Sequence, residues 1–283
     1  MRRTLLAVLF SIIAVGLIAT AHAGSFSEDF ESYSGTDGDA LGTVASSTWT
    51  DDAAGIKWSA SAPDIAGGGN TNKAARHPAS SGGHHRTTSV GSFTTDGLTQ
   101  FTVSAMFRAA GTVDGSLDAF VAVGPPALGN SDDTSFLFGF NDGNLRAYVP
   151  NSGCCRLDAV LGGGTVDPDK WLEVEVTYNV IAGGSNDTIT ARYRNATDSG
   201  AWIDMVGHSS GGLESSHADG NITGGAEEID TAGPNAVLLQ TRANHDIFID
   251  NIQVTIPEPT SFALAGLGLL GVAVCGSRRQ RRR

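Results

Sequence analysis

The sequence predicts an all-β fold, a two-sheet antiparallel sandwich, for the middle of the chain. Twelve short segments rich in β-branched and aromatic residues are separated by Gly, Asn, Asp and Ser. No stretch between the two ends of the chain shows a helical period. The expected strands are residues 26–33, 55–60, 86–93, 99–109, 117–123, 135–141, 145–149, 171–179, 188–194, 202–206, 237–242 and 246–256. A series of short strands with turn signals between them is typical of two packed antiparallel sheets.

Alternation and turn chemistry support individual strands. Residues 101–108 alternate Phe, Val, Ala and Phe with Thr, Ser, Met and Arg, and residues 172–178 alternate Leu, Val, Val and Tyr with Glu, Glu and Thr. Each of these strands is therefore expected to bury one face and expose the other. Asn141-Asp142-Gly143-Asn144 predicts a tight hairpin turn between two strands.

The first 23 residues have the pattern of a secretory signal peptide. Arg2 and Arg3 precede an apolar run over residues 5–18, and Ala21-His22-Ala23 is a small-x-small cleavage site before Gly24. The alternative is an uncleaved N-terminal anchor. We expect the secretion machinery to export the chain.

The last residues carry a second targeting pattern. Pro257, Glu258 and Pro259 form an extended segment, because the two prolines lack N–H donors and disfavour helix. An apolar run over residues 260–276 follows, which as a helix would span about 25 Å. The five arginines Arg278, Arg279, Arg281, Arg282 and Arg283 would hold its end on the cytoplasmic side. The alternative is an ordinary C-terminal membrane anchor.

This arrangement resembles a PEP-CTERM sorting signal, with Ile256 where many members carry Val. The resemblance implies that an exosortase, a membrane-bound transpeptidase-like protease, cuts the chain. It implies a membrane-anchored precursor and then attachment to the cell surface, the envelope or an extracellular matrix. The predicted parts are a signal peptide (1–23), a β-sandwich domain (24–256) and a sorting signal (257–283).

Charge and cysteine content limit what the domain does. Residues 24–256 hold 11 of the Lys and Arg and 29 of the Asp and Glu, which leaves a net charge of −18. A strongly acidic domain does not favour nucleic acid as a partner, because phosphate binding needs positive charge. Cys154 and Cys155 are adjacent and Cys275 lies in the terminal apolar run. Stability must therefore come from a packed core rather than a disulfide framework.

Three segments of the domain resemble strands of concanavalin-A-like and laminin-G-like jelly rolls. They are residues 28–33 (EDFESY), 170–176 (KWLEVEV) and 248–254 (FIDNIQV). The resemblance implies a jelly-roll sandwich, a tendency to bind glycans and, in some members, a structural calcium ion. It also implies that the first and last strands lie side by side.

The acids at the two ends of the domain form a candidate calcium site. The apolar face of the last strand changes at Asp250-Asn251, which predicts a β-bulge there. If the terminal strands are neighbours, Glu28, Asp29 or Glu31 can meet Asp250, and clustered carboxylates repel unless a cation lies among them. The alternative is that these acids are exposed or paired with Lys or Arg.

Exposed aromatic rings are the candidate sugar-binding residues, because glycans stack on aromatic faces. Trp49, Trp58, Trp202 and Tyr148 are the candidates, and core positions are the alternative for each.

No catalytic residue is predicted. The Glu-x-Asp-x-x-Glu pattern of laminarinase-type relatives is absent from the sequence, and Glu173 and Glu175 suit a solvated outer face as well as a catalytic pair. Gly162-Gly163-Gly164 is expected to form a flexible turn, and residues 207–235 a surface excursion. The sequence thus predicts a non-catalytic glycan-binding or adhesive module. The alternatives are a jelly-roll glycoside hydrolase or polysaccharide lyase, and a ligand-free structural envelope protein.

Overall fold

The computed structural model describes residues 25–50, 55–65, 71–79, 85–89, 93–94, 100–111, 113, 118–124, 135–150, 157–179, 188–207, 234–242 and 245–256. All of them belong to the compact unit Gly24–Ile256. The predicted signal peptide, sorting motif and terminal apolar run lie outside these residues, as do Cys154, Cys155 and residues 208–233. Within the described ranges, no helix is long and apolar enough to cross a membrane.

The first sheet has the strand order β13-β12-β11-β6-β16-β3-β2, and β1 also pairs with β16. Its pairings are all antiparallel. The strands are β1 (Phe26–Glu28), β2 (Lys57–Pro63), β3 (Thr71–His77), β6 (Gln100–Ala109), β11 (Leu172–Asn179), β12 (Thr188–Asn195), β13 (Ile203–Asp204) and β16 (Ile247–Thr255).

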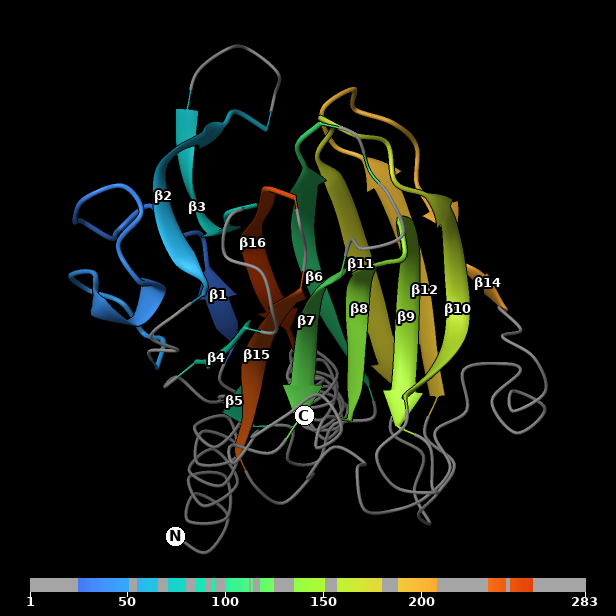
Figure 1. Ribbon diagram of the computed structural model, residues 1–283. Helices are drawn as coiled ribbons and strands as arrows, with labels where there is room; N and C mark the ends of the chain where they lie inside the picture. The colour runs from blue at the N-terminus through green and yellow to red at the C-terminus, as the bar shows by residue number, and fades with distance from the viewer. Residues whose placement is uncertain are drawn as a thin grey trace, which may run out of the picture. The chain divides into compact units, whose positions relative to one another are not determined.

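The second sheet has the order β14-β10-β9-β8-β7-β15-β4, and β5 also pairs with β15. Its strands are β4 (His85–Thr88), β5 (Phe93–Thr94), β7 (Asp118–Gly124), β8 (Phe136–Asn141), β9 (Asn144–Pro150), β10 (Leu157–Thr165), β14 (Val206–Gly207) and β15 (Pro234–Arg242). A short 3-10 turn, η1 (Leu41–Thr43), follows β1. Figure 1 shows β7, β8 and β9 in one layer, with β6, β11 and β12 in the layer behind.

Aromatic side chains from both sheets fill the space between the layers. Phe107 of β6 packs against Phe138 and Phe140 of β8, with ring centroids 6.0 and 5.4 Å apart. Tyr178 of β11 lies 5.5 Å from Phe136 of β8. Burial of this apolar surface is the main force that holds the two sheets together. The all-β, two-sheet antiparallel jelly-roll sandwich predicted from the sequence is confirmed.

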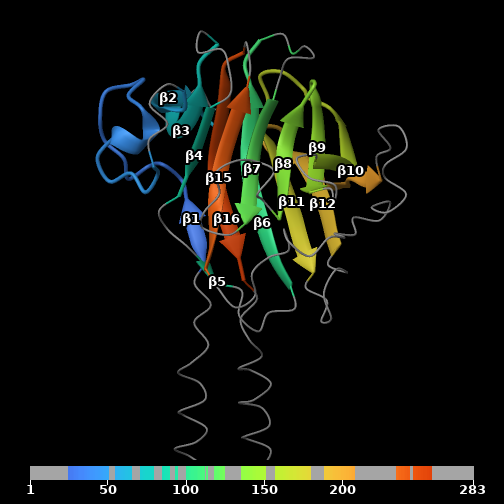
Figure 2. The same ribbon diagram turned by 60° about the horizontal axis from the view of Figure 1, so that its bottom comes forward.

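One short segment closes an edge of the sandwich. Within residues 203–207, β13 pairs with β12 in the first sheet and β14 pairs with β10 in the second. Met205 between them is buried, and its N–H donates to the carbonyl oxygen of Ala191 at 2.9 Å. In Figure 2 the labels β12 and β10 mark this edge in the two layers. The closure places Trp202 and Asp204 at the border of the first sheet.

Local predictions from the sequence hold where the pattern is strong. Burial alternates along the whole of β6 and β11. The turn between β8 and β9 has Asp142 at φ 47° and Gly143 at φ 73°, the two positive values that a type I′ hairpin requires.

The predictions from the sequence missed two strands and overextended β1, and residues 202–206, expected as one strand, instead contain β13 and the start of β14, which belong to different sheets. β3 has no aromatic or Val/Ile residue to mark it, and β10 contains Gly162-Gly163-Gly164, for which a turn was predicted. In the structure these glycines bring a bulge to the strand, because the register shifts between Gly162 and Gly164 and Gly164 has φ 93°. β1 ends at Glu28, since the chain turns at Phe30, whose φ is 57°.

The two ends of the domain meet as predicted. β1 pairs antiparallel with β16, with Phe26 opposite Val254 and Glu28 opposite Ile252. The register of β16 on β6 shifts between Asp250 and Gln253, and Asn251 has φ 47°. The predicted bulge at Asp250-Asn251 is therefore confirmed.

Candidate functional site

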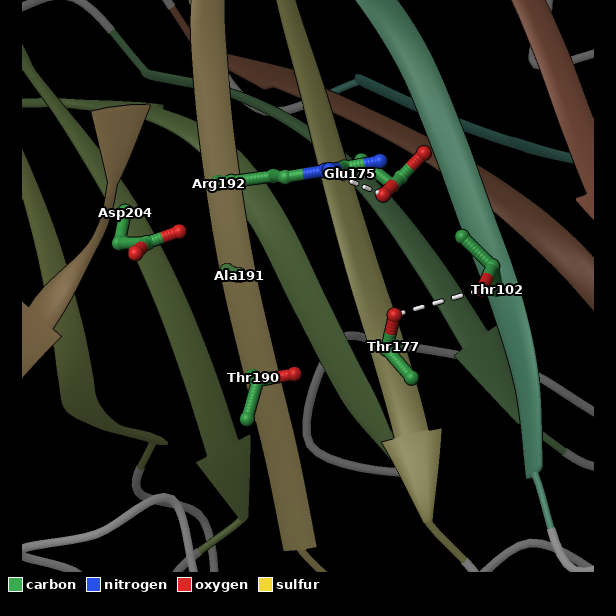
Figure 3. A pocket seen from close by; sticks show the side chains of 7 residues that line it. All are labelled: Thr102, Glu175, Thr177, Thr190, Ala191, Arg192 and Asp204. Carbon is green, nitrogen blue, oxygen red and sulfur yellow. Dashed lines mark hydrogen bonds and ion pairs between the residues drawn. The ribbon is translucent and has the colours of Figure 1, made fainter. Parts of the chain in front are cut away.

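The outer face of the first sheet carries a shallow hollow of about 400 Å³. It is lined by Thr102, Glu175, Thr177, Thr190, Ala191, Arg192 and Asp204, which come from β6, β11, β12 and β13 (Figure 3). Because neighbouring strands are in register, side chains of one row lie next to each other across the sheet. All seven lining residues lie on strands, so the sheet itself fixes their positions.

Two ion pairs cross from β11 to β12 on this face. Glu175 Oε1 accepts a hydrogen bond from Arg192 Nε at 2.6 Å, and Glu173 Oε2 accepts one from Arg194 Nε at 2.5 Å. The glutamates are the pair that the sequence analysis considered as catalytic, and each sits directly opposite its arginine. The hydrogen bond with Glu175 raises the pKa of Arg192, so this guanidinium stays charged. Such pairing is typical of a solvated outer face.

Trp202 stands against the two arginines of these pairs. Its ring centroid lies 4.4 Å from Arg192 Cζ and 4.7 Å from Arg194 Cζ. Guanidinium groups at this distance are attracted to the ring and limit how far it can move. Trp202 is half-buried, so part of its ring still faces solvent.

Hydroxyl groups form the other side of the hollow. Thr102 Oγ1 and Thr177 Oγ1 are 3.3 Å apart and share a hydrogen bond, and Thr190 lies opposite Thr177 on β12. Figure 3 shows these threonines below the Glu175–Arg192 pair, with Asp204 across the hollow from it. The hollow therefore offers carboxylates, a guanidinium and hydroxyls within one short stretch of sheet.

The other three predicted sugar-binding aromatics are buried. Trp49 and Trp58 are each 3% exposed and Tyr148 is 9% exposed, so none offers a free face to a sugar ring. Trp49 stacks on Phe30, and its indole N–H donates to Glu28. Tyr148 donates to Asn141 Oδ1 on the outer face of the second sheet, and burial raises its pKa. Their burial corrects this part of the prediction, and of the four rings only Trp202 remains at the surface.

The four predicted calcium ligands divide into two kinds. Glu28 is buried, and its carboxylate accepts hydrogen bonds from Phe30 N, Tyr33 Oη, Thr48 Oγ1 and Trp49 Nε1. This network ties the first strand to the segment after η1 and occupies the carboxylate with four hydrogen bonds. Asp29 and Glu31 are exposed at the turn after β1.

Asp250 is the other buried acid. It is 2% exposed, accepts hydrogen bonds from Asn72 Nδ2 at 2.6 Å and from Asn251 N at 2.7 Å, and lies at the bulge of β16. Burial raises its pKa to about 8, and the charges of Glu31, Asp29 and Glu28 add to the rise while the Asn251 N–H opposes it. The acids that follow β1 are therefore close enough to Asp250 for their charges to affect its pKa.

Asn72 and Lys73 belong to this cluster and were not found from the sequence. Asn72 Oδ1 is buried without a partner among the described residues. The Lys73 ammonium donates to the carbonyl oxygens of Glu31 at 2.6 Å and Tyr33 at 2.9 Å, and the backbone N–H of Lys73 donates to Glu31 Oε1. Both lie on β3, a strand without sequence signal. Within the described ranges, no group of three or more His, Cys, Asp or Glu is placed to hold a metal ion.

The comparison with protein families identifies the C-terminal segment of the chain. The family described as the PEP-CTERM protein-sorting motif matches residues 255–279. The chain carries a PEP-CTERM sorting motif. This confirms the resemblance stated for Pro257, Glu258 and Pro259, and it indicates an exported surface protein that an exosortase processes.

The match to known structures is distant. No curated protein matches the sequence. The T. cruzi calreticulin globular domain is similar at 10% identity and a TM-score of 0.46, covering 85% of this chain and 90% of that one. The exoplasmic/lumenal domain of VIP36, in a Ca²⁺/Man3GlcNAc-bound form, is similar at 11% identity and a TM-score of 0.42, covering 74% and 84%.

An engineered GH43 glycoside hydrolase is similar at 10% identity and a TM-score of 0.44. The match covers 80% of this chain, which spans 42% of that enzyme. At these values the similarities assign no ligand or activity to this chain.

Proposed function

We propose that the domain Gly24–Ile256 is a non-catalytic polysaccharide-binding module of an exported protein, and that it binds through the outer face of the first sheet. The observation that carries this proposal is the hollow beside Trp202. There two Glu–Arg pairs and a group of threonine hydroxyls lie together on neighbouring strands, and the ring of Trp202, the residue just before β13, packs against the two arginines.

The chemistry of the hollow suits sugars. Sugar hydroxyls both donate and accept hydrogen bonds, and carboxylates, guanidiniums and threonine hydroxyls supply both kinds of partner. An exposed portion of an indole ring contacts the apolar C–H face of a sugar. Because Arg192 and Arg194 already hold Trp202, little side-chain freedom is lost when a ligand binds.

The binding role fits the surroundings of Glu173 and Glu175 better than a hydrolytic role. A glycoside hydrolase needs one carboxylic acid that gives up a proton to the leaving group. Both glutamates are instead ion-paired with arginines on the neighbouring strand. The hydrolase alternative makes its own prediction: turnover of a polysaccharide that falls on Glu173→Ala or Glu175→Ala.

Export and maturation give the module its place. In this proposal the signal peptide of residues 1–23 directs secretion, the terminal apolar run holds the precursor in the membrane, and exosortase cuts near Pro257-Glu258-Pro259. The mature domain then joins the cell surface, the envelope or an exopolysaccharide matrix. A ligand-free structural envelope protein would mature in the same way but would bind no glycan.

A structural calcium ion at the meeting point of the termini is a further part of the proposal. Asp250 and the unpartnered Asn72 Oδ1 supply buried oxygens, and Asp29 and Glu31 supply exposed ones. Calcium prefers oxygen ligands of this kind. Glu28 acts beside them as the hydrogen-bonded anchor of the first strand rather than as a ligand.

The binding proposal is tested by affinity gel electrophoresis of the mature domain in gels that contain a polysaccharide. We expect retarded migration that Trp202→Ala abolishes. Ile203→Ala is the matched control, because Ile203 is the next residue, is 52% exposed and points to the opposite side of the strand. Unretarded migration in every polysaccharide tested would refute the proposal.

A further inference from the structure

The hollow is one part of a longer ordered array on the same face. Four rows of side chains cross β6, β11 and β12 in register. The rows are Gln100–Asn179–Thr188, Thr102–Thr177–Thr190, Ser104–Glu175–Arg192 and Met106–Glu173–Arg194. From Glu173 to Asn179 the array extends for about 20 Å along β11, at the rise of an antiparallel strand.

One half of the array consists of neutral hydrogen-bonding groups. Gln100 Nε2 donates to Asn179 Oδ1 at 2.7 Å, and Asn179 Nδ2 donates to Thr188 Oγ1 at 3.1 Å. The next row holds Thr102 and Thr177, which share a hydrogen bond. These two rows contain no charged side chain, and their partners on adjacent strands hold them in place.

The other half is charged but largely compensated. The guanidiniums of Arg192 and Arg194 are paired with Glu175 and Glu173, and Asp204 faces Arg192 from β13. An anionic polymer would compete with these carboxylates for the same two arginines. An uncharged polymer meets no such competition, and it can use the remaining acceptor and donor positions of both halves.

The residues that line the hollow all rise from strands, as Figure 3 shows, so the sheet forms a floor beneath the ligand. A floor of this kind suits the interior of an extended chain, whereas capture of a chain end needs a pocket with walls.

We propose that this face is an elongated track for an extended, uncharged polysaccharide. The hollow beside Trp202 binds one part of the chain, and the amide row Gln100–Asn179–Thr188 forms a second subsite for sugar units farther along. This inference rests on the proposed glycan-binding function and specifies its ligand class and its second contact.

The test begins with affinity electrophoresis against neutral polymers (dextran, laminarin, xylan and hydroxyethyl cellulose) and anionic ones (alginate and polygalacturonate). Oligosaccharides of two to eight units from the retained polymer are then titrated by calorimetry. We compare the intact domain with Trp202→Ala and with the double variant Gln100→Ala/Asn179→Ala. Asn144→Ala is the control, because it removes an amide from the second sheet. Circular dichroism checks that each variant is folded.

The track predicts retention by a neutral polymer and affinity that rises with chain length. The amide double variant should bind the longest oligosaccharides about tenfold more weakly, as expected for one or two lost hydrogen bonds, and should bind the shortest ones unchanged. Trp202→Ala should weaken binding at every length.

Three results would overturn the inference. If the amide variant binds long chains as well as the intact domain while Trp202→Ala still weakens binding, the track is refuted and the glycan-binding proposal stands. Preferential retention by alginate or polygalacturonate would contradict an uncharged ligand. Retention by no polymer would refute the proposed function and the track together.

Discussion

The substitution Asp250→Asn tests the electrostatic balance where the two termini meet. Burial raises the pKa of Asp250 from 3.8 to about 8, so the folded domain keeps a proton there that the unfolded chain releases. A carboxyl with a raised pKa destabilises the fold as pH rises: the cost is absent below about pH 4, grows through the interval between the two pKa values and is complete above about pH 8. The difference between the folded and unfolded pKa values of Asp250 corresponds to a loss of roughly 5 kcal/mol in the free energy of unfolding at high pH.

Asparagine at position 250 has no carboxyl group to ionise, and it can keep the hydrogen bonds with Asn251 and Asn72. Its carbonyl oxygen can still accept from Asn251 N, and the Asn72 side chain can turn so that its unpartnered Oδ1 accepts from the new amide. Without calcium, we therefore expect Asp250→Asn to stabilise the domain by several kcal/mol at pH 8 and to leave its stability nearly unchanged at pH 4.

Urea unfolding of both proteins between pH 4 and pH 8 in a chelator measures this difference. Asp167→Asn, which changes an exposed acid in the segment after β10, is run beside it as the control. If Asp250→Asn and the unchanged domain lose stability with pH in parallel, the reasoning about Asp250 is refuted.

Three further changes have expected outcomes. Millimolar calcium should raise the melting temperature at pH 8 but not at pH 4, where Asp250 holds its proton, and equal temperatures in calcium and in chelator at pH 8 would count against a calcium site. Glu258→Ala in the full chain should leave an uncut, membrane-retained precursor on immunoblots of cell fractions, and normal maturation would argue against exosortase recognition of this motif. Gly163→Ala should destabilise the domain by about 1–3 kcal/mol in urea, because the new Cβ would lie 2.9 Å from Leu145 Cβ. An unchanged unfolding midpoint would show that Leu145 can shift to accommodate the new methyl group without loss of stability.

The sequence predicts the fold best where side-chain patterns are strong. The alternation along β6 and β11, the Asp142-Gly143 turn and the face change at Asp250 all carry direct physical signals, and the structure has each of them. β3 and β10 are not predicted because they form strands through pairing and packing with other strands and not through a pattern in their own residues. β3 is rich in Ala and polar residues, and Gly163 of β10 is required because Leu145 and Tyr193 pack where a side chain would otherwise lie.

The candidate site shows the same limit. The sequence singles out Trp202 and the Glu173–Glu175 pair, but as separate features. Their meeting depends on the register of β12 against β11 and on the edge closure at residues 203–207, neither of which leaves a local pattern. Burial of Trp49, Trp58 and Tyr148 is likewise a property of the packed sandwich, since an aromatic residue on a strand suits the core and the surface equally well.

The binding site is tested most directly by the migration of the mature domain through gels that contain neutral polysaccharides, with Trp202→Ala and Ile203→Ala run beside it. At least one polymer should slow the intact domain and the Ile203 variant but not the Trp202 variant. Equal retardation of all three proteins would contradict a binding site on the outer face of the first sheet.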